Sequence, residues 1–299
     1  MPMRSPCHAS PGRTKSAPIS HGLCCYAGCM RITVLPLALL CLPLLAVAQQ
    51  QEQEPESQPA RYLLGASLAS RPEYDGASTR QTKLRPLWAF QWGRWRISTS
   101  GGSAILGFGR DSAGAGASTL LVNSNRLRLG VALRVDSGRN SGDASTTQGL
   151  PDVKRTLRAR LFANYSLTPD VNLGANLSQD ILGRKGGLTA GVDLGWRFYR
   201  SPTLEWASGI GISAADATNM RSYFGVPASA VTATGKPAYE PGAGLRDLHA
   251  GVSFTRPLSK HWFVFGGAGA SRLLGPPADS PLTQQRNGTY ANVGVAWRN

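Results

Sequence analysis

The sequence predicts an all-β, transmembrane, up-and-down antiparallel barrel of about twelve strands. Apolar and polar residues alternate along most segments after Arg61, and the connections between these segments are alternately short and long. Several segments reach the roughly 9–11 residues that a tilted strand needs to cross a bilayer, whereas strands of soluble proteins usually have about 5–6. A soluble β-sandwich is the alternative, and the number and length of the alternating segments disfavour it.

The clearest hairpin extends from Thr156 to Leu182. Its first strand alternates apolar residues such as Leu157 and Leu161 with polar ones, and Thr168-Pro169-Asp170 forms a turn signal. The second strand resumes the alternation at Val171. Period-two alternation puts one set of residues on each face of a sheet. One face is therefore apolar, and the other carries arginine, asparagine, serine and glycine.

The remaining strands are predicted from the same alternation, and Asp111–Thr119 is interpreted as a connection of small residues. Short connections such as Gly93-Arg94 should lie at the periplasmic end, and long ones such as Ser137–Val153 and Ala214–Gly244 at the outer end. The other expected strands are Arg61–Ala69, Thr82–Trp92, Trp95–Ser100, Ser103–Phe108, Asn125–Val135, Leu188–Tyr199, Leu204–Ser213, Leu245–Thr255, His261–Leu273 and Tyr290–Arg298. Aromatic residues lie near many strand ends, as the interfacial girdles of such barrels do.

Residues 1–48 are interpreted as an N-terminal extension followed by a secretory signal peptide. Met30-Arg31 precedes an apolar run from Ile32 to Leu45, and Ala46-Val47-Ala48 provides a cleavage site. We expect translation to start at Met30. Residues 49–60 are polar and are predicted to be a disordered lead-in, and residues 61–299 form the barrel.

Charge and cysteine content restrict the function of the exported chain. All five cysteines precede Gln49, which excludes disulfides and thiol chemistry after cleavage. Four of the 32 basic residues and none of the 17 acidic residues precede Gln49, so the remainder carries a net charge of +11. This charge favours anionic partners such as lipopolysaccharide, acidic glycans or anionic solutes. Nucleic acid is not expected, because the chain leaves the cytoplasm.

Several short motifs resemble the MipA/OmpV family of outer-membrane proteins from Tyr62 onward. They include Pro72-Glu73-Tyr74-Asp75-Gly76, Tyr223-Phe224-Gly225-Val226, Ala238-Tyr239-Glu240-Pro241-Gly242 and Leu258-Ser259-Lys260-His261-Trp262. The resemblance implies a barrel in the outer membrane of a Gram-negative bacterium, in contact with lipid and lipopolysaccharide. It also implies a non-enzymatic scaffold for murein-remodelling enzymes, namely a lytic transglycosylase and a murein synthase. Such barrels usually end on an aromatic residue, and Trp297 is expected to take that role because the final residue is Asn299.

Basic residues recur on the polar face of neighbouring strands, which we expect to line the lumen because a charge facing lipid is costly. They could form an anion-attracting constriction, which makes a narrow pore for small anions the alternative function. They could instead be neutralised by Asp136, Asp193 or Asp247 in a filled lumen. The lumen-lining candidates are Arg126, Arg128, Arg134, Arg158, Arg160, Asp193, Asp247 and His249.

Catalysis and metal binding have little support in the sequence. Asp247, His249 and Ser253 supply the residue types of a nucleophilic triad, but no nucleophile motif surrounds any serine. The separated His249 and His261 do not give a metal-ligand spacing. We therefore expect no enzyme activity, catalytic residue, metal or cofactor. The Ala214–Gly244 loop could fold into the lumen or project as a partner surface, and the sequence leaves both possibilities open.

Overall fold

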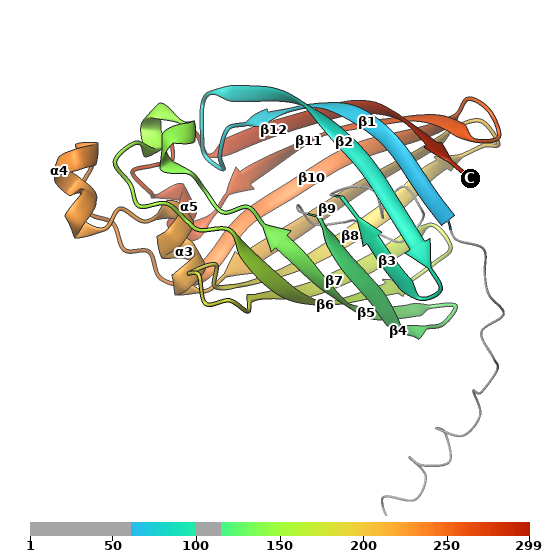
Figure 1. The fold of residues 1–299 in the computed structure, drawn as a ribbon, viewed down its shortest axis with the longest axis horizontal. Helices are drawn as coiled ribbons and strands as arrows, with labels where there is room; N and C mark the ends of the chain where they lie inside the picture. Colours follow the sequence, from blue (N-terminus) through green and yellow to red (C-terminus); the bar gives the residue numbers. More distant parts are fainter. Residues whose placement is uncertain (1–60, 100–114) are drawn as a thin grey trace, which may run out of the picture. The chain divides into compact units, whose positions relative to one another are not determined.

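A computed structural model describes residues 61–99 and 115–299, and these form a closed antiparallel barrel (Figure 1). Each strand pairs with its neighbours in sequence, and β1 pairs with β12, which confirms the predicted fold class. The expected signal peptide, the expected disordered lead-in and the expected strand Ser103–Phe108 lie outside the described residues. The strands are β1 (Arg61–Pro72), β2 (Arg80–Trp92), β3 (Trp95–Ser98), β4 (Gly116–Asn123), β5 (Leu127–Asp136), β6 (Thr156–Ser166), β7 (Val171–Asp180), β8 (Leu188–Arg200), β9 (Glu205–Ala215), β10 (Gly244–Pro257), β11 (Trp262–Leu273) and β12 (Asn287–Arg298).

The fourth strand differs from the prediction. The sequence predicts a connection over Asp111–Thr119, but β4 begins at Gly116 and pairs with β5. Its register shifts between Leu120 and Val122, which marks a bulge or irregularity. A bulge interrupts the two-residue alternation, so the apolar residues become consecutive and the strand pattern is lost from the sequence.

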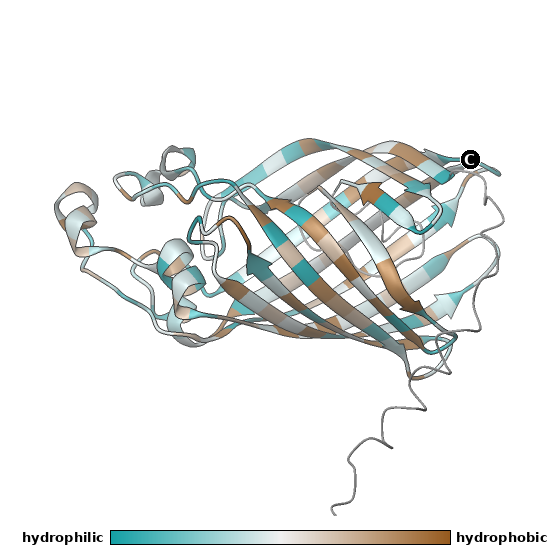
Figure 2. Ribbon diagram, turned by 60° about the horizontal axis from the view of Figure 1, so that its bottom comes forward, coloured by the Kyte–Doolittle hydropathy of each residue, from teal (hydrophilic) through white to brown (hydrophobic). Residues whose placement is uncertain are grey.

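The outer surface of the barrel is apolar. Leu161 on β6, Leu194 on β8 and Val293 on β12 are all exposed large hydrophobic residues, and brown and teal positions alternate along the strands in Figure 2. Contact with lipid requires a band of exposed aliphatic side chains on the outside of a barrel. It also requires that backbone polar groups be paired, which closure of the sheet achieves. Exposed aromatic residues such as Trp92 and Trp262 lie next to the short turns.

Short turns and long loops lie at opposite ends of the barrel, as predicted. The short connections are 93–94, 124–126, 167–170, 201–204 and 258–261, at the end where β1 begins and β12 finishes (Figure 1). The long loops contain the helices α3 (Ala217–Phe224), α4 (Val231–Thr234) and α5 (Gly275–Ala278). None of the described helices has the length and apolar character needed to cross a membrane.

Three long loops pack together into a structure that we call the cap, formed by residues 137–155, 216–243 and 274–286. One cluster of buried apolar residues joins all three loops through Leu150, Val226 and Leu282. In a second cluster, Met220 and Phe224 of α3 pack against Leu273 at the end of β11. The Ala214–Gly244 loop therefore packs over the strand ends and against its neighbouring loops.

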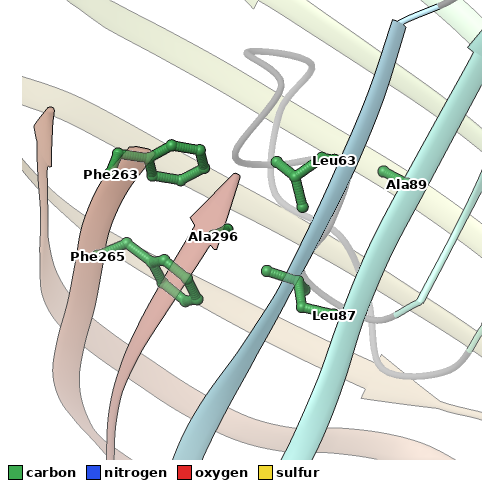
Figure 3. Packing of buried hydrophobic residues seen from close by; sticks show 6 residues of the cluster. All are labelled: Leu63, Leu87, Ala89, Phe263, Phe265 and Ala296. Carbon is green, nitrogen blue, oxygen red and sulfur yellow. The ribbon is translucent and has the colours of Figure 1, made fainter. Parts of the chain in front are cut away.

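The largest apolar cluster lies on the β1, β2, β11 and β12 side of the sheet (Figure 3). These residues alternate in sequence with lipid-facing ones: Leu63 is fully buried, whereas Leu64 is 57 % exposed. They therefore belong to the inner face of the barrel. The members are Leu63, Leu87, Ala89, Phe263, Phe265 and Ala296. One side of the lumen is thus apolar.

Candidate functional site

The lumen contains a cavity of about 640 Å³ with an arginine-rich wall. Five arginines from four strands line it: Arg96 of β3, Arg128 and Arg134 of β5, Arg160 of β6, and Arg197 of β8. All five interact with other groups of the protein. Asp193 lines the same cavity, as do Leu87 and Phe265 of the apolar cluster. The cavity is therefore amphipathic.

Arg96 was missed in the sequence analysis, although it alternates with the exposed Trp95 and Ile97. The same period-two pattern that selected the other arginines could have identified it. Arg126 lies in the short turn before β5, and its side chain is exposed at the end of the barrel. Arg126 therefore occupies the rim rather than a strand of the lumen wall.

Arg158 is buried at the loop end of the barrel, where it holds the β7–β8 loop. Its guanidinium donates to the carbonyl oxygens of Gly186 and Gly187 at 2.9 and 3.0 Å. It also lies 3.4 Å from the Asp136 carboxylate. Neutralisation by Asp136 is one of the two arrangements that the sequence predicts for the basic residues, and Arg158 has it. Arg158 acts here as a structural clamp.

Asp193, Gly211 and His249 form a row across three adjacent strands. Gly211 of β9 is the register partner of Asp193 on β8 and of His249 on β10. Because Gly211 has no side chain, His249 Nε2 reaches over it to within 2.9 Å of Asp193 Oδ1. His249 Nδ1 lies 2.7 Å from Asp247 Oδ1. The imidazole is therefore held between two carboxylates, and the row ties β8 to β10 across β9.

The serines near this row do not assemble a nucleophilic triad. Ser213 Oγ donates to the other oxygen of Asp247 at 2.5 Å and so is directed at the carboxylate. Ser253 is four residues beyond His249 on β10, a separation of about 13 Å at the usual strand rise. Among residues 61–99 and 115–299, no hydrogen bond links Ser253 to His249. No group of three or more histidine, cysteine or acidic side chains in that part of the chain could hold a metal ion.

Arg246 extends the polar network toward the β1–β2 loop. The register of β10 against β9 shifts between Leu245 and Asp247, so Arg246 falls at an irregularity of the strand. Its guanidinium forms an ion pair with Asp75 and lies 3.7 Å from Asp247. Arg246 is not among the lumen residues predicted from the sequence, because the irregularity displaces it from the alternating pattern.

Tyr223 of α3 connects the cap to the end of β5. Its hydroxyl group donates to the Asp136 carboxylate at 3.2 Å. Burial, followed by the negative charge of Asp136, raises the pKa of the Tyr223 phenol. The backbone oxygen of Tyr223 accepts from Arg139 at 3.1 Å, and burial lowers the pKa of that guanidinium. These contacts fix α3 over the loop end of the barrel.

A family model described as "MltA-interacting protein MipA" matches residues 64–299. The chain belongs to the MipA family. This confirms the resemblance found in the sequence and agrees with the closed transmembrane barrel described above. No curated protein matches this MipA-family chain.

The solved structures that are similar to this MipA-family barrel include porins of low sequence identity. The KdgM porin has a TM-score of 0.39 and 10% identity, over 79% of this chain and 98% of that one. The NanC porin has a TM-score of 0.41 and 8% identity, over 78% and 98%. An anion-selective porin from Comamonas acidovorans has a TM-score of 0.38 and 10% identity, over 80% and 98%. With TM-scores below 0.5, these likenesses carry no conclusion about what the present chain transports or binds.

Proposed function

We propose that this MipA-family barrel is a non-enzymatic scaffold of the outer membrane that docks murein-remodelling enzymes at its periplasmic end. The observation that carries the proposal is the family match over residues 64–299, since the family is described by its interaction with MltA. In keeping with the expectation from sequence, the enzymes are a lytic transglycosylase and a murein synthase. Lipid and lipopolysaccharide surround the barrel.

The cap is a packed structure at the loop end of the barrel, which suits a scaffold protein. Its three loops bury Leu150, Val226 and Leu282 against one another, while α3 packs on the end of β11. Loops that share a hydrophobic core move less readily than loops that are only solvated.

The short-turn end offers a basic surface for docking. Arg94, Arg126 and Lys260 are exposed in three separate turns. Among the ion pairs found in the described part of the chain, only those of Arg197 with Asp170 and Glu205 involve this rim. Because short turns face the periplasm in such barrels, an acidic surface of a murein enzyme would meet this rim.

The test is chemical cross-linking of the mature protein in outer membranes, followed by affinity capture and mass spectrometry. The wild-type chain should enrich a lytic transglycosylase or a murein synthase. The R94E/K260E variant should lose most of this enrichment, whereas K236E/R155E, which makes the same charge change in the cap, should keep it. Absence of murein enzymes from the wild-type capture would refute the scaffold proposal.

A narrow pore for small anions is the second candidate function, because five arginines line the lumen cavity. Rings of basic side chains favour anions in channels. Purified protein in a planar bilayer would then conduct with a preference for chloride over potassium. Replacing Arg128 and Arg160 by glutamate should reverse that preference. A protein that inserts but does not conduct would exclude the pore.

A further inference from the structure

A second polar cavity, of about 910 Å³, lies among the loops at the capped end of the barrel. Its walls come from the β5–β6 loop, the β7–β8 loop, α3 and the chain that follows α3. Figure 1 shows α3 at the end of the barrel opposite the short turns. The volume is within the roughly 300–1,000 Å³ typical of small-molecule sites. It is separate from the lumen cavity, because the two have no lining residue in common.

The lining of this cavity is strongly basic. Five cationic side chains line it, against the two carboxylates of Asp152 and Glu240; the five are Arg139, Lys154, Arg184, Lys185 and Arg221. Asp152 is already engaged by the Ser141 backbone N–H at 2.8 Å. Within the described ranges, no ion pair to a carboxylate involves any of the five.

The backbone that presents Lys185 is fixed on several sides. The Lys185 carbonyl accepts from Ser222 Oγ at 2.6 Å. The Gly186 carbonyl accepts from Asn219 at 2.7 Å and from Arg158 at 2.9 Å, while the Gly186 N–H donates to Asp180 at 2.8 Å. The β7–β8 loop is therefore held against α3 and against the strand ends, and the cavity wall is preformed.

Lys185 itself has an unfavourable backbone conformation. Its φ of 65° makes it the one non-glycine residue in the described part of the chain with a positive φ. Glycine or asparagine would suit this conformation better than a long side chain. Strain of this kind is retained where the surrounding structure enforces it, and it is often found at binding sites. It places an extra cation at the cavity.

We propose that this cavity, the loop-end basic cavity, binds a phosphate-bearing saccharide. Phosphate groups carry up to two negative charges and several acceptor oxygens, and lysine and arginine are their usual partners. The long-loop end of such a barrel faces the outside. Phosphorylated sugars of lipopolysaccharide in the surrounding leaflet meet the cavity there. A free sugar phosphate has the same chemistry, and the experiment distinguishes the two sources.

The experiment measures binding to the full mature protein in detergent micelles by isothermal titration. The probes are lipopolysaccharide, enzymatically dephosphorylated lipopolysaccharide and glucose 1-phosphate. Wild type should bind lipopolysaccharide at least about tenfold more tightly than the dephosphorylated form, since each charge-assisted hydrogen bond lost costs about a factor of ten or more. Equal binding of both forms would overturn the proposal. Binding of glucose 1-phosphate with no preference for the glycolipid would assign the cavity to soluble sugar phosphates.

Two variants connect the binding to this cavity. R184E/K185E should weaken lipopolysaccharide binding at least about tenfold, while K236E/R155E, an equal charge change outside the cavity lining, should remain within about twofold of wild type. The second variant of the cavity, Lys185→Gly, removes one positive charge and has a residue that suits the positive φ. It should therefore bind lipopolysaccharide more weakly than wild type while being at least as stable. Unchanged binding in both cavity variants would refute the assignment. The murein-enzyme capture by R184E/K185E should remain at the wild-type level, which separates this result from the scaffold proposal.

Discussion

The imidazole of His249 lies 2.9 Å from the carboxylate of Asp193, although a whole strand separates the two residues in the sheet. The strand between them carries Gly211 at the crossing point, where an added Cβ would come within 2.3 Å of Asp193 Oδ1 and 2.5 Å of His249 Nε2. The contact therefore depends on the missing side chain of a third residue.

Gly211→Ala should separate His249 from Asp193 and destabilise the barrel by about 1–3 kcal/mol, the usual cost of overpacking. Urea unfolding in micelles, followed by tryptophan fluorescence, measures the change. Gly195→Ala is the matched control, because its Cβ would meet only the Asn172 carbonyl at 3.9 Å. A similar loss of stability in both variants would contradict this explanation.

Arg158→Ala should destabilise the barrel by about 3–5 kcal/mol, because it leaves a partly buried Asp136 without its cation and releases two loop carbonyls. The freed β7–β8 loop should be cleaved faster by trypsin after Arg184 and Lys185. Arg197→Ala removes the more exposed pairs with Asp170 and Glu205 and should cost at most about 1 kcal/mol. Equal trypsin sensitivity in the two variants would show that Arg158 does not hold the loop.

Tyr223→Phe should make stability less sensitive to alkaline pH. Burial raises the pKa of Tyr223, so the folded state retains the proton where the unfolded chain loses it, near pH 10. This contribution is fully present below that pH and is lost as the pH rises through the higher folded-state pKa. Unfolding of wild type and variant should be compared from pH 8 upward, with the exposed Tyr199 replaced by Phe as the control. Parallel curves for all three proteins would argue against the Tyr223–Asp136 coupling.

Leu161→Arg should reduce barrel stability in lipid vesicles by about 2–4 kcal/mol, because Leu161 is exposed in the middle of β6 on the lipid-facing surface. Leu161→Met keeps the position apolar and should change stability by less than about 1.5 kcal/mol. Folding is followed by the mobility of unheated samples on gels. Normal stability of the arginine variant would place this face away from lipid.

The alternation of residues along the chain was sufficient to predict the barrel, and the lengths of the connections predicted that the short turns share one end of it. The alternation failed at two of the three places in the described residues where the register of a strand pair shifts. At β4 the register shift near Leu121 puts apolar residues next to each other, and at Arg246 a second irregularity breaks the pattern. Both are local departures from the two-residue alternation, and they can be recognised only from the pairing with the neighbouring strand.

The sites were less predictable than the fold. Alternation selected Arg128, Arg134 and Arg160, which line the lumen cavity, but it could not distinguish them from Arg158, which clamps a loop. The difference depends on contacts with residues distant in sequence. The cap was also beyond sequence reasoning, because its core joins Leu150, Val226 and Leu282 from three separate loops.

The pairing of β1 with β12 has a consequence for biogenesis. Tyr62 donates its backbone N–H to the Asn299 side chain, a contact between residues 237 positions apart. All other strand pairs join neighbours in the chain, so they can form one hairpin after another. The β1–β12 pair can form only after all the strands between them have paired. Until it closes, two strand edges carry unpaired amides that would be costly in hydrocarbon. Pairing of β1 with β12 is therefore the step at which an insertion catalyst would have the greatest effect. Such a catalyst would bind the free edge of β1 until β12 is in place.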